Sequence, residues 1–334
     1  MKYLVSLFTL IFLAVACSSP TPTPPARPTR QAAPPTRGAV SEQPQGPKST
    51  STVQPLTRTP MPTAPETVTP ALGGGEVDVT QLTETETDIL GMYKDDTNAY
   101  NDVIAAGARV VNLEPMHTFF IVWVPDGYKE MATRRVMVVA HGHTGSSYFQ
   151  MAKELEFARK YGYAVVAIQW WAGEGDKMYS GEQFYAFMDT ALRYMAYKYN
   201  AQLDKCAYRG WSMGSAISFE VTYLDKIKGT HYLKLTISHD GGMWPDPSQM
   251  AVGREFVTNL YNGMYGDDAF EGKHFYLYAG KEQAKIMRNT AEVIPKFGGV
   301  VERLVEDLSA GHDGFFEHPQ YHEEAIEIFF QLAP

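Results

Sequence analysis

Short apolar segments alternate with segments of helical periodicity, and this alternation most constrains what the chain can fold into. The expected strands are residues 117–124, 135–140, 164–171, 205–210, 233–238, 275–279 and 300–308. The expected helices are residues 93–109, 149–161, 181–199, 213–224, 285–296 and 323–332. Strands that alternate with helices predict the α/β class, with a mostly parallel central sheet covered by helices on both faces. In such sheets, ligands and catalytic groups gather at the carboxyl ends of the strands.

The first 75 residues have a different composition. Lys2 precedes an apolar run at residues 4–16 that is too short to anchor a protein across a bilayer, and small residues precede Cys17. We interpret residues 1–16 as a secretory signal peptide. Residues 18–75 contain 14 of the 21 prolines and no aromatic residue, so they cannot bury enough apolar area to fold. We expect residues 17–75 to be a disordered Pro/Thr-rich tether and residues 76–334 to be one catalytic domain.

Charge and cysteine content exclude two classes of protein. Residues 18–75 carry five basic side chains against two acidic ones, and Lys2 adds one positive charge, so the net charge of −9 leaves −13 for residues 76–334. An acidic domain argues against nucleic acid as a partner. Cys17 and Cys206 are the two cysteines, so the predicted domain cannot hold a disulfide framework.

The sequence Gly210-Trp211-Ser212-Met213-Gly214 follows a predicted strand and opens a predicted helix. This is the G-x-S-x-G pattern in the strand–turn–helix context that gives it meaning. The turn is tight, it raises the serine hydroxyl above the sheet, and a Cβ two residues to either side would collide with the neighbouring strand and helix. The pattern predicts Ser212 as a nucleophile, and the alternative is a serine that merely caps the helix.

Three stretches carry a family resemblance: residues 140–145 (AHGHTG), 208–214 (YRGWSMG) and 311–316 (GHDGFF). Together they make the chain from about residue 119 to residue 330 resemble the α/β-hydrolase superfamily. Within it, the general layout is similar to secreted feruloyl esterases and poly(3-hydroxybutyrate) depolymerases. Separately, residues 13–17 (LAVAC) resemble a bacterial lipoprotein signal, which implies lipidation of Cys17 and attachment to the cell surface. The alternative is cleavage after Ala16, which gives a fully secreted protein.

The resemblance implies the remaining parts of the site. Acyl transfer needs two N–H donors for the oxyanion, which are expected from Met213 and from the loop after the strand 135–140, at His143 or Thr144. The competing interpretation of His141 and His143 is a metal site, but residues 144–147 offer no further ligand. We therefore expect neither a metal nor an organic cofactor.

His312 follows the last predicted strand, which is the family's position for the general base. The family takes its acid after the penultimate strand, where Glu282 is the one carboxylate. Asp240, at the end of the preceding strand, is the alternative.

Tryptophans 171, 211 and 244 lie in the loops expected to face the site. They could form an aromatic wall that binds substrate, and the alternative is that they pack the core. Residues 241–272 are longer than a connection needs and are expected to form a small cap.

These expectations combine into one function. The chain is predicted to be an extracellular serine esterase that forms an acyl-enzyme at Ser212, with a small-molecule or polymer-linked ester as substrate and membrane contact only through a lipid on Cys17. The alternatives are a peptidase or acyltransferase on the same fold, or a catalytically inactive surface binding module.

Overall fold

The computed structural model describes residues 77–143, 145–172 and 178–334. Cys17, the expected signal peptide and the expected tether lie outside these residues, and so does Thr144. None of the described helices is both long enough and apolar enough to cross a bilayer.

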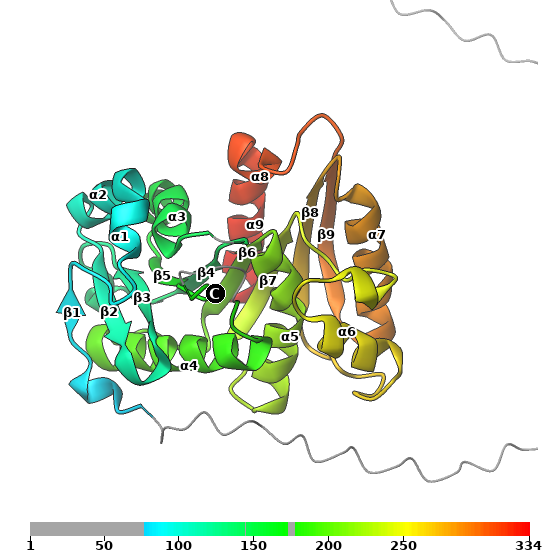
Figure 1. The fold of residues 1–334 in the computed structure, drawn as a ribbon, viewed down its shortest axis with the longest axis horizontal. Coiled ribbons are helices and arrows are strands. Elements are labelled where there is room, and N and C mark those ends of the chain that lie inside the picture. The colour runs from blue at the N-terminus through cyan, green and yellow to red at the C-terminus, as the bar shows by residue number, and fades with distance from the viewer. Residues whose placement is uncertain (1–76, 144, 173–177) are drawn as a thin grey trace, which may run out of the picture. The chain divides into compact units, whose positions relative to one another are not determined.

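In the described part of the chain, nine strands form one sheet in the order β1-β2-β3-β5-β4-β6-β7-β8-β9. They are β1 (Glu84–Thr85), β2 (Arg109–Leu113), β3 (Thr118–Trp123), β4 (Val136–Ala140), β5 (Ala164–Ile168), β6 (Cys206–Trp211), β7 (Leu233–His239), β8 (His274–Gly280) and β9 (Val300–Asp307). The pairs from β5 to β9 are parallel, whereas β1, β2 and β3 pair antiparallel. Figure 1 shows the antiparallel strands at one edge of the sheet and β8 and β9 at the other. The predicted mostly parallel sheet is confirmed.

Helices cover both faces of this sheet, as predicted. They are α1 (Met92–Asp95), α2 (Thr97–Ala105), α3 (Ser147–Tyr161), α4 (Gly181–Tyr199), α5 (Met213–Ile227), α6 (Arg254–Tyr261), α7 (Ala284–Val293), α8 (Gly314–Glu317) and α9 (Pro319–Leu332). On one face α2, α3 and α9 share a core cluster with the sheet; on the other, α4 and α5 form a second cluster and α6 and α7 a third. Side chains of successive strand residues point to opposite faces of the sheet, and in β8 Tyr276 accordingly joins the first cluster and Leu277 the third.

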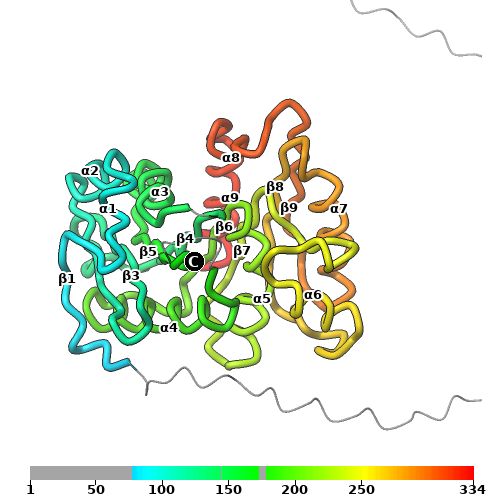
Figure 2. Tube along the Cα trace, viewed as in Figure 1, coloured from blue at the N-terminus to red at the C-terminus, as the bar shows by residue number. Residues whose placement is uncertain are grey.

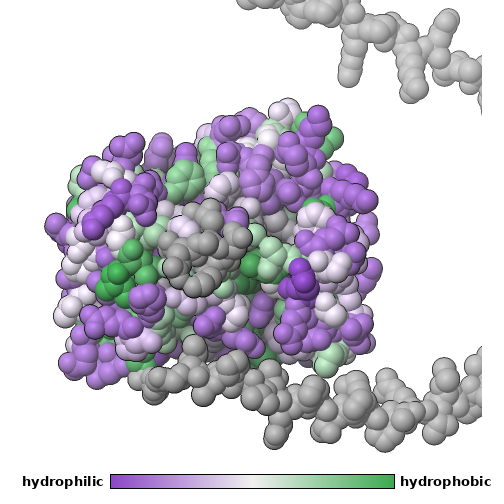
Figure 3. Space-filling model, in the orientation of Figure 1, coloured by the Kyte–Doolittle hydropathy of each residue, from purple (hydrophilic) through white to green (hydrophobic). Residues whose placement is uncertain are grey.

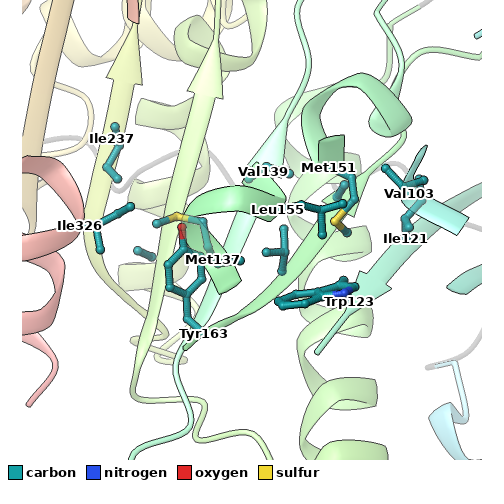
Figure 4. Close-up of a cluster of buried hydrophobic side chains, with 14 of the residues drawn as sticks. Val103, Ile121, Trp123, Met137, Val139, Met151, Leu155, Tyr163, Ile237 and Ile326 are labelled. Atoms are coloured by element: carbon teal, nitrogen blue, oxygen red, sulfur yellow. The ribbon is translucent and has the colours of Figure 1, made fainter. Parts of the chain in front are cut away.

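The first cluster packs large side chains from distant parts of the sequence. Val103 of α2, Met151 of α3 and Ile326 of α9 meet strand residues such as Val139 and Ile237, and all five are fully buried (Figure 4). Burying such a side chain contributes on the order of 1.5–3 kcal/mol. One core cluster therefore joins segments that together span more than 200 residues of the sequence.

The path of the chain explains how its last part reaches the middle of the sheet. Figure 2 shows the chain running from β1 across to α6, α7 and β9, after which α8 and α9 return to lie between α3 and the β8–β9 edge. Helix α9 packs against β7, at the centre of the parallel strands. The face seen in Figure 3 is mostly hydrophilic, with separate apolar patches.

Several predicted boundaries differ from the structure, and three of the differences have clear local reasons. The segment expected as one helix at residues 93–109 ends at Ala105, because Gly107 has φ of 92° and the chain then enters β2. The helix expected at residues 285–296 ends as regular α-helix at Val293, and a 3₁₀ turn containing Pro295 follows. The last helix starts at Pro319 and not at residue 323, since proline suits the first turn of a helix.

Candidate active site

Ser212 occupies a strained turn between β6 and α5. Its backbone has φ of 55° and ψ of −116°, a combination that residues other than glycine rarely adopt. The surrounding chain holds this conformation: the Ser212 N–H donates to the carbonyl of His239 (3.0 Å), and its carbonyl accepts from the N–H of Ala216 (3.0 Å). The turn therefore lies at the carboxyl end of β6, directly beside the end of β7.

Glycines allow neighbouring backbone segments to pack closely against the turn at Ser212. A Cβ on Gly210 would lie 2.2 Å from the carbonyl oxygen of Gly214, which confirms the steric reason for the predicted glycine spacing. A Cβ on Gly241 would lie 2.0 Å from the carbonyl oxygen of Ser212 itself. Gly241, which follows Asp240, is a requirement that sequence reasoning missed.

Substituting Gly241 by Ala should therefore reduce ester hydrolysis by about a hundredfold, because the added methyl displaces the serine turn by a fraction of an ångström or more. Gly229→Ala is the matched control: Gly229 has φ of 74°, but no atom lies within 4 Å of an added Cβ. It should cost on the order of 1 kcal/mol of stability and leave the rate unchanged. Steady-state kinetics on both variants check this, and an unaltered rate in Gly241→Ala would show that the turn tolerates displacement.

The loop after β4 packs directly against Ser212. A Cβ on Gly142 would lie 3.0 Å from the Ser212 Cβ. Met213 is the first residue of α5, and in the described residues its N–H has no hydrogen-bond acceptor. His143 follows Gly142 and is exposed. The loop and the start of α5 thus both border the serine, where an oxyanion site needs its two N–H donors.

His141 anchors this loop and is not positioned as a metal ligand. Its Nε2 lies 3.1 Å from the N–H of Trp170 and must accept that hydrogen bond, so Nδ1 carries the proton and donates to the carbonyl of Gly142 (2.7 Å). Burial lowers the pKa of His141 to about 4, which keeps the ring neutral. In the described residues, no three His, Cys, Asp or Glu side chains are grouped so as to hold a metal ion.

His312 lies in the loop between β9 and α8 and is held beside the serine turn by Trp211. The Trp211 indole N–H donates to the His312 carbonyl (3.2 Å), and the two ring centroids are 5.4 Å apart. Because Trp211 immediately precedes Ser212, this contact brings together the two segments that sequence reasoning assigned to nucleophile and base. The His312 side chain is half-buried.

Asp240 directly follows β7 in a second strained conformation, with φ of 58°, and it is 1% exposed. Its Oδ1 accepts from the N–H of Gly280 (2.7 Å), while Oδ2 is buried without a hydrogen-bond partner among the described residues. A Cβ on Gly280 would lie 2.0 Å from the carbonyl oxygen of Gly311, the residue before His312. Asp240 is therefore linked to the His312 loop through Gly280.

Burial raises the pKa of Asp240 to about 7. The hydrogen bond from Gly280 opposes this rise, and the charges of Asp313 and Glu282 add to it. A buried carboxylate with an elevated pKa and an unused oxygen is typical of a functional site.

Glu282, the acid favoured by the family position, is placed differently. It is exposed, and its carboxylate makes no hydrogen bond or ion pair within the described residues. The Lys281 N–H donates to the carbonyl of Ala310 (2.9 Å), which ties the backbone before Glu282 to the His312 loop, while the carboxylate stays at the surface. In this structure Asp240, not Glu282, lies buried beside that loop.

Behind the serine turn, Arg209 forms a buried polar network that sequence reasoning missed. Its Nε donates to Glu154 (2.6 Å), and its Nη1 lies 3.3 Å from Nε2 of His239; all three side chains are fully buried. Arg209 and His239 each lie just before a site segment, on β6 and β7 respectively. The signal in the sequence is a charged residue within an otherwise apolar predicted strand, and the network fixes these two strands relative to α3.

The three tryptophans have separate surroundings. Trp211 packs against the His312 loop, as described, and Trp171 pairs with Met178 in an isolated antiparallel bridge. Trp244 is half-buried against the third core cluster. The structure does not join them into one aromatic wall.

A pocket of about 1080 Å³ opens beside the serine turn, and we call it the α5 pocket. Its walls come from the loop after β4, the start of α4, one face of α5, and the segment around α6. The lining residues are His143, Met178–Gln183, Met213, Ile217, Glu220, Tyr223, Ala251–Phe256, Asn259, Met264 and Tyr265. The segment that was expected to form a small cap thus supplies one wall, and none of the three tryptophans lines the pocket.

Comparisons with known proteins identify this architecture. No family model matches the chain, and no curated protein matches its sequence. Among solved structures, an esterase from the fungus Rhizomucor miehei has a TM-score of 0.52 at 17% identity, covering 73% of this chain and 89% of that one. A bifunctional GH43-CE protein of Bacteroides eggerthii also has a TM-score of 0.52, at 13% identity, covering 66% of this chain and 34% of that one. At these identities the likeness shows the fold: the described part of this chain has the α/β-hydrolase fold.

Proposed function

We propose that this protein is a serine hydrolase that cleaves carboxylic esters, with Ser212 as nucleophile, His312 as general base and Asp240 as the acid. The strained turn at Ser212 carries the proposal, because a conformation that costs on the order of 1–3 kcal/mol persists where it positions a reactive group. Asp240 takes the place of Glu282 because its carboxylate is buried, has a free oxygen and accepts a hydrogen bond from Gly280, which packs against Gly311 of the His312 loop. The esterase structures with the same fold support the reaction class.

These roles define the proposed reaction. The Ser212 oxygen attacks the ester carbonyl while His312 takes its proton, and the tetrahedral oxyanion accepts hydrogen bonds from the N–H groups of Met213 and His143. The C–O bond then breaks, and His312 gives its proton to the leaving alcohol. Water, deprotonated by His312, attacks the acyl-enzyme, and the proton returns through His312 to Ser212 as the carboxylic acid leaves. Asp240 orients the imidazole and stabilises the imidazolium.

The location of the reaction is part of the proposal. A signal peptide over residues 1–16 and a lipid on Cys17 would place the domain outside the cell on a tether, with release of a fully secreted form as the alternative. In that setting we propose an ester carried on a polysaccharide or a polyester as the substrate.

A substrate panel tests the reaction class. The purified protein should hydrolyse p-nitrophenyl acetate and butyrate with burst kinetics, which report the acyl-enzyme, and should leave peptide anilides intact. Faster cleavage of the anilides would identify a peptidase, and transfer of the acyl group to an added alcohol in preference to water would identify an acyltransferase. Absence of activity on the whole panel would favour an inactive binding module.

A further inference from the structure

The α5 pocket leads away from the nucleophile along one face of α5. Met213, Ile217 and Glu220 all line it, and their spacing of four and three residues puts them on the same side of the helix. At a rise of about 1.5 Å per residue, Glu220 lies about 10 Å along the helix from Met213. One arm of an ester bound at Ser212 can therefore extend along this wall towards the Glu220 carboxylate.

Glu220 has no hydrogen-bond donor from the protein within the described residues. Its side chain is half-buried, and its carboxylate packs so closely on Gly181 that a Cβ there would lie 2.2 Å from the Glu220 Cδ. Burial, together with the charges of Glu182 and Glu255, raises the pKa of Glu220 to about 7. The carboxylate remains available to a group that enters the pocket.

Among the described residues that line the pocket, the charged side chains have a negative balance. Glu182 comes from α4, Glu220 from α5 and Glu255 from α6, and Arg254 is the one guanidinium among the lining residues. The Nε and Nη2 of Arg254 both donate to the carbonyl of Met250 (3.0 and 2.8 Å). That guanidinium is thus held by the backbone, and no described contact pairs it with a pocket carboxylate.

Aromatic rings form part of the same wall. Tyr223 and Tyr265 have ring centroids 4.5 Å apart, and Phe256 stacks on Tyr265 at 5.4 Å. All three rings line the pocket. Aromatic faces attract cations, so these rings and the carboxylates favour the same kind of ligand.

We propose that the α5 pocket binds a cationic group of the ammonium class on one arm of the ester substrate, with Glu220 as the residue that determines this specificity. The inference rests on the proposed esterase function and adds the charge of the preferred substrate. An anionic arm would meet three carboxylates and is disfavoured by the same charges.

Matched esters that differ only in charge test the proposal. One series consists of p-nitrophenyl octanoates with a terminal trimethylammonium group, with the neutral tert-butyl group of the same shape, or with a terminal carboxylate. The second series carries the same three groups on the alcohol arm of an acetate ester. Assays at pH 8.5 keep Glu220 ionised, and Glu327→Gln is the matched control, since Glu327 is exposed on α9 at the opposite face of the sheet.

In at least one series, kcat/KM should be about tenfold higher for the cationic ester than for the neutral one, and lower still for the anionic ester. Glu220→Gln should bring the cationic-to-neutral ratio close to one, while Glu327→Gln keeps it. Thermal melting and labelling of Ser212 by a fluorophosphonate show that the variant is folded. Equal hydrolysis of cationic and neutral esters in both series would overturn the proposal and leave the esterase function standing, whereas no hydrolysis of any ester would overturn both.

Discussion

Asp240→Asn should lower kcat about ten-thousandfold, because an amide can neither hold the productive tautomer of His312 nor stabilise its protonated form. Asparagine keeps the shape of the side chain and can still accept the hydrogen bond from Gly280, so the backbone at residue 240 is preserved. Glu282→Gln is the matched control, since Glu282 is the exposed carboxylate of the neighbouring loop. The kcat of Glu282→Gln should stay within about twofold of the wild-type value, because substitutions at exposed positions away from the site have small effects.

The same substitution should make the protein more stable at alkaline pH. The pKa of Asp240 rises from 3.8 to about 7 on folding, so the native state holds a proton that the unfolded state has released between these values. Stability from this group is thus fully retained below about pH 4 and is lost as the pH rises to about 7. Roughly three pKa units correspond to about 4 kcal/mol, an upper limit for the gain in Asp240→Asn at pH 8.

Denaturant titrations of wild type and Asp240→Asn at pH 4 and pH 8 measure this gain. The free energies of unfolding should coincide at pH 4 and diverge at pH 8, with the variant more stable. A kcat that falls in Glu282→Gln and not in Asp240→Asn would return the acid to Glu282. Unchanged stability at both pH values would mean that Oδ2 of Asp240 already pairs with the His312 ring in the resting protein, which would contradict the raised pKa and leave the assignment of the acid standing.

Ser212→Ala should reduce kcat by about a millionfold, since removing the nucleophile costs about as much as removing the whole triad. The substitution keeps a Cβ in the turn, so the strain at φ of 55° and the hydrogen bonds from the Ser212 backbone are retained. The free energy of unfolding should therefore stay within about 0.5 kcal/mol of the wild type. Loss of activity without loss of stability separates a catalytic role from a capping role.

Ser248→Ala provides the matched control for this variant. Ser248 is exposed in a 3₁₀ turn, and its contacts with Asp246 stay within that turn. Ester hydrolysis should be unchanged. Residual hydrolysis in Ser212→Ala above about one per cent of the wild-type rate would contradict the assignment of the nucleophile.

The parallel part of the fold could be predicted because each buried strand is a continuous apolar run between helices of clear period. At the antiparallel edge β3 was predicted but β2 was not, because Arg109 and Asn112 interrupt the apolar pattern of β2 and no polar break separates it from the short helix before it. Residues 109–113 form a strand because they pair with β1 and β3 on either side, although their own sequence favours a strand only weakly. Local periodicity does not report such pairing.

The segments of the site could be predicted from G-x-S-x-G and from the order of the strands, but the choice of acid could not. Glu282 and Asp240 lie at the ends of neighbouring strands, and which of them is buried depends on how Gly280 packs against Gly311. Glu220 was missed because it lies two turns into a helix whose other residues predict a buried stripe. Glu220 lies seven residues, or about two helical turns, after Met213, and this spacing could have indicated that both residues face the same pocket.

Covalent labelling gives the most direct test of the proposed nucleophile. After incubation with a fluorophosphonate, digestion and mass spectrometry, we expect one adduct on the peptide that contains Ser212, and no adduct in Ser212→Ala. An adduct on a different residue, or an unmodified Ser212 in a protein that still cleaves p-nitrophenyl butyrate, would contradict the account.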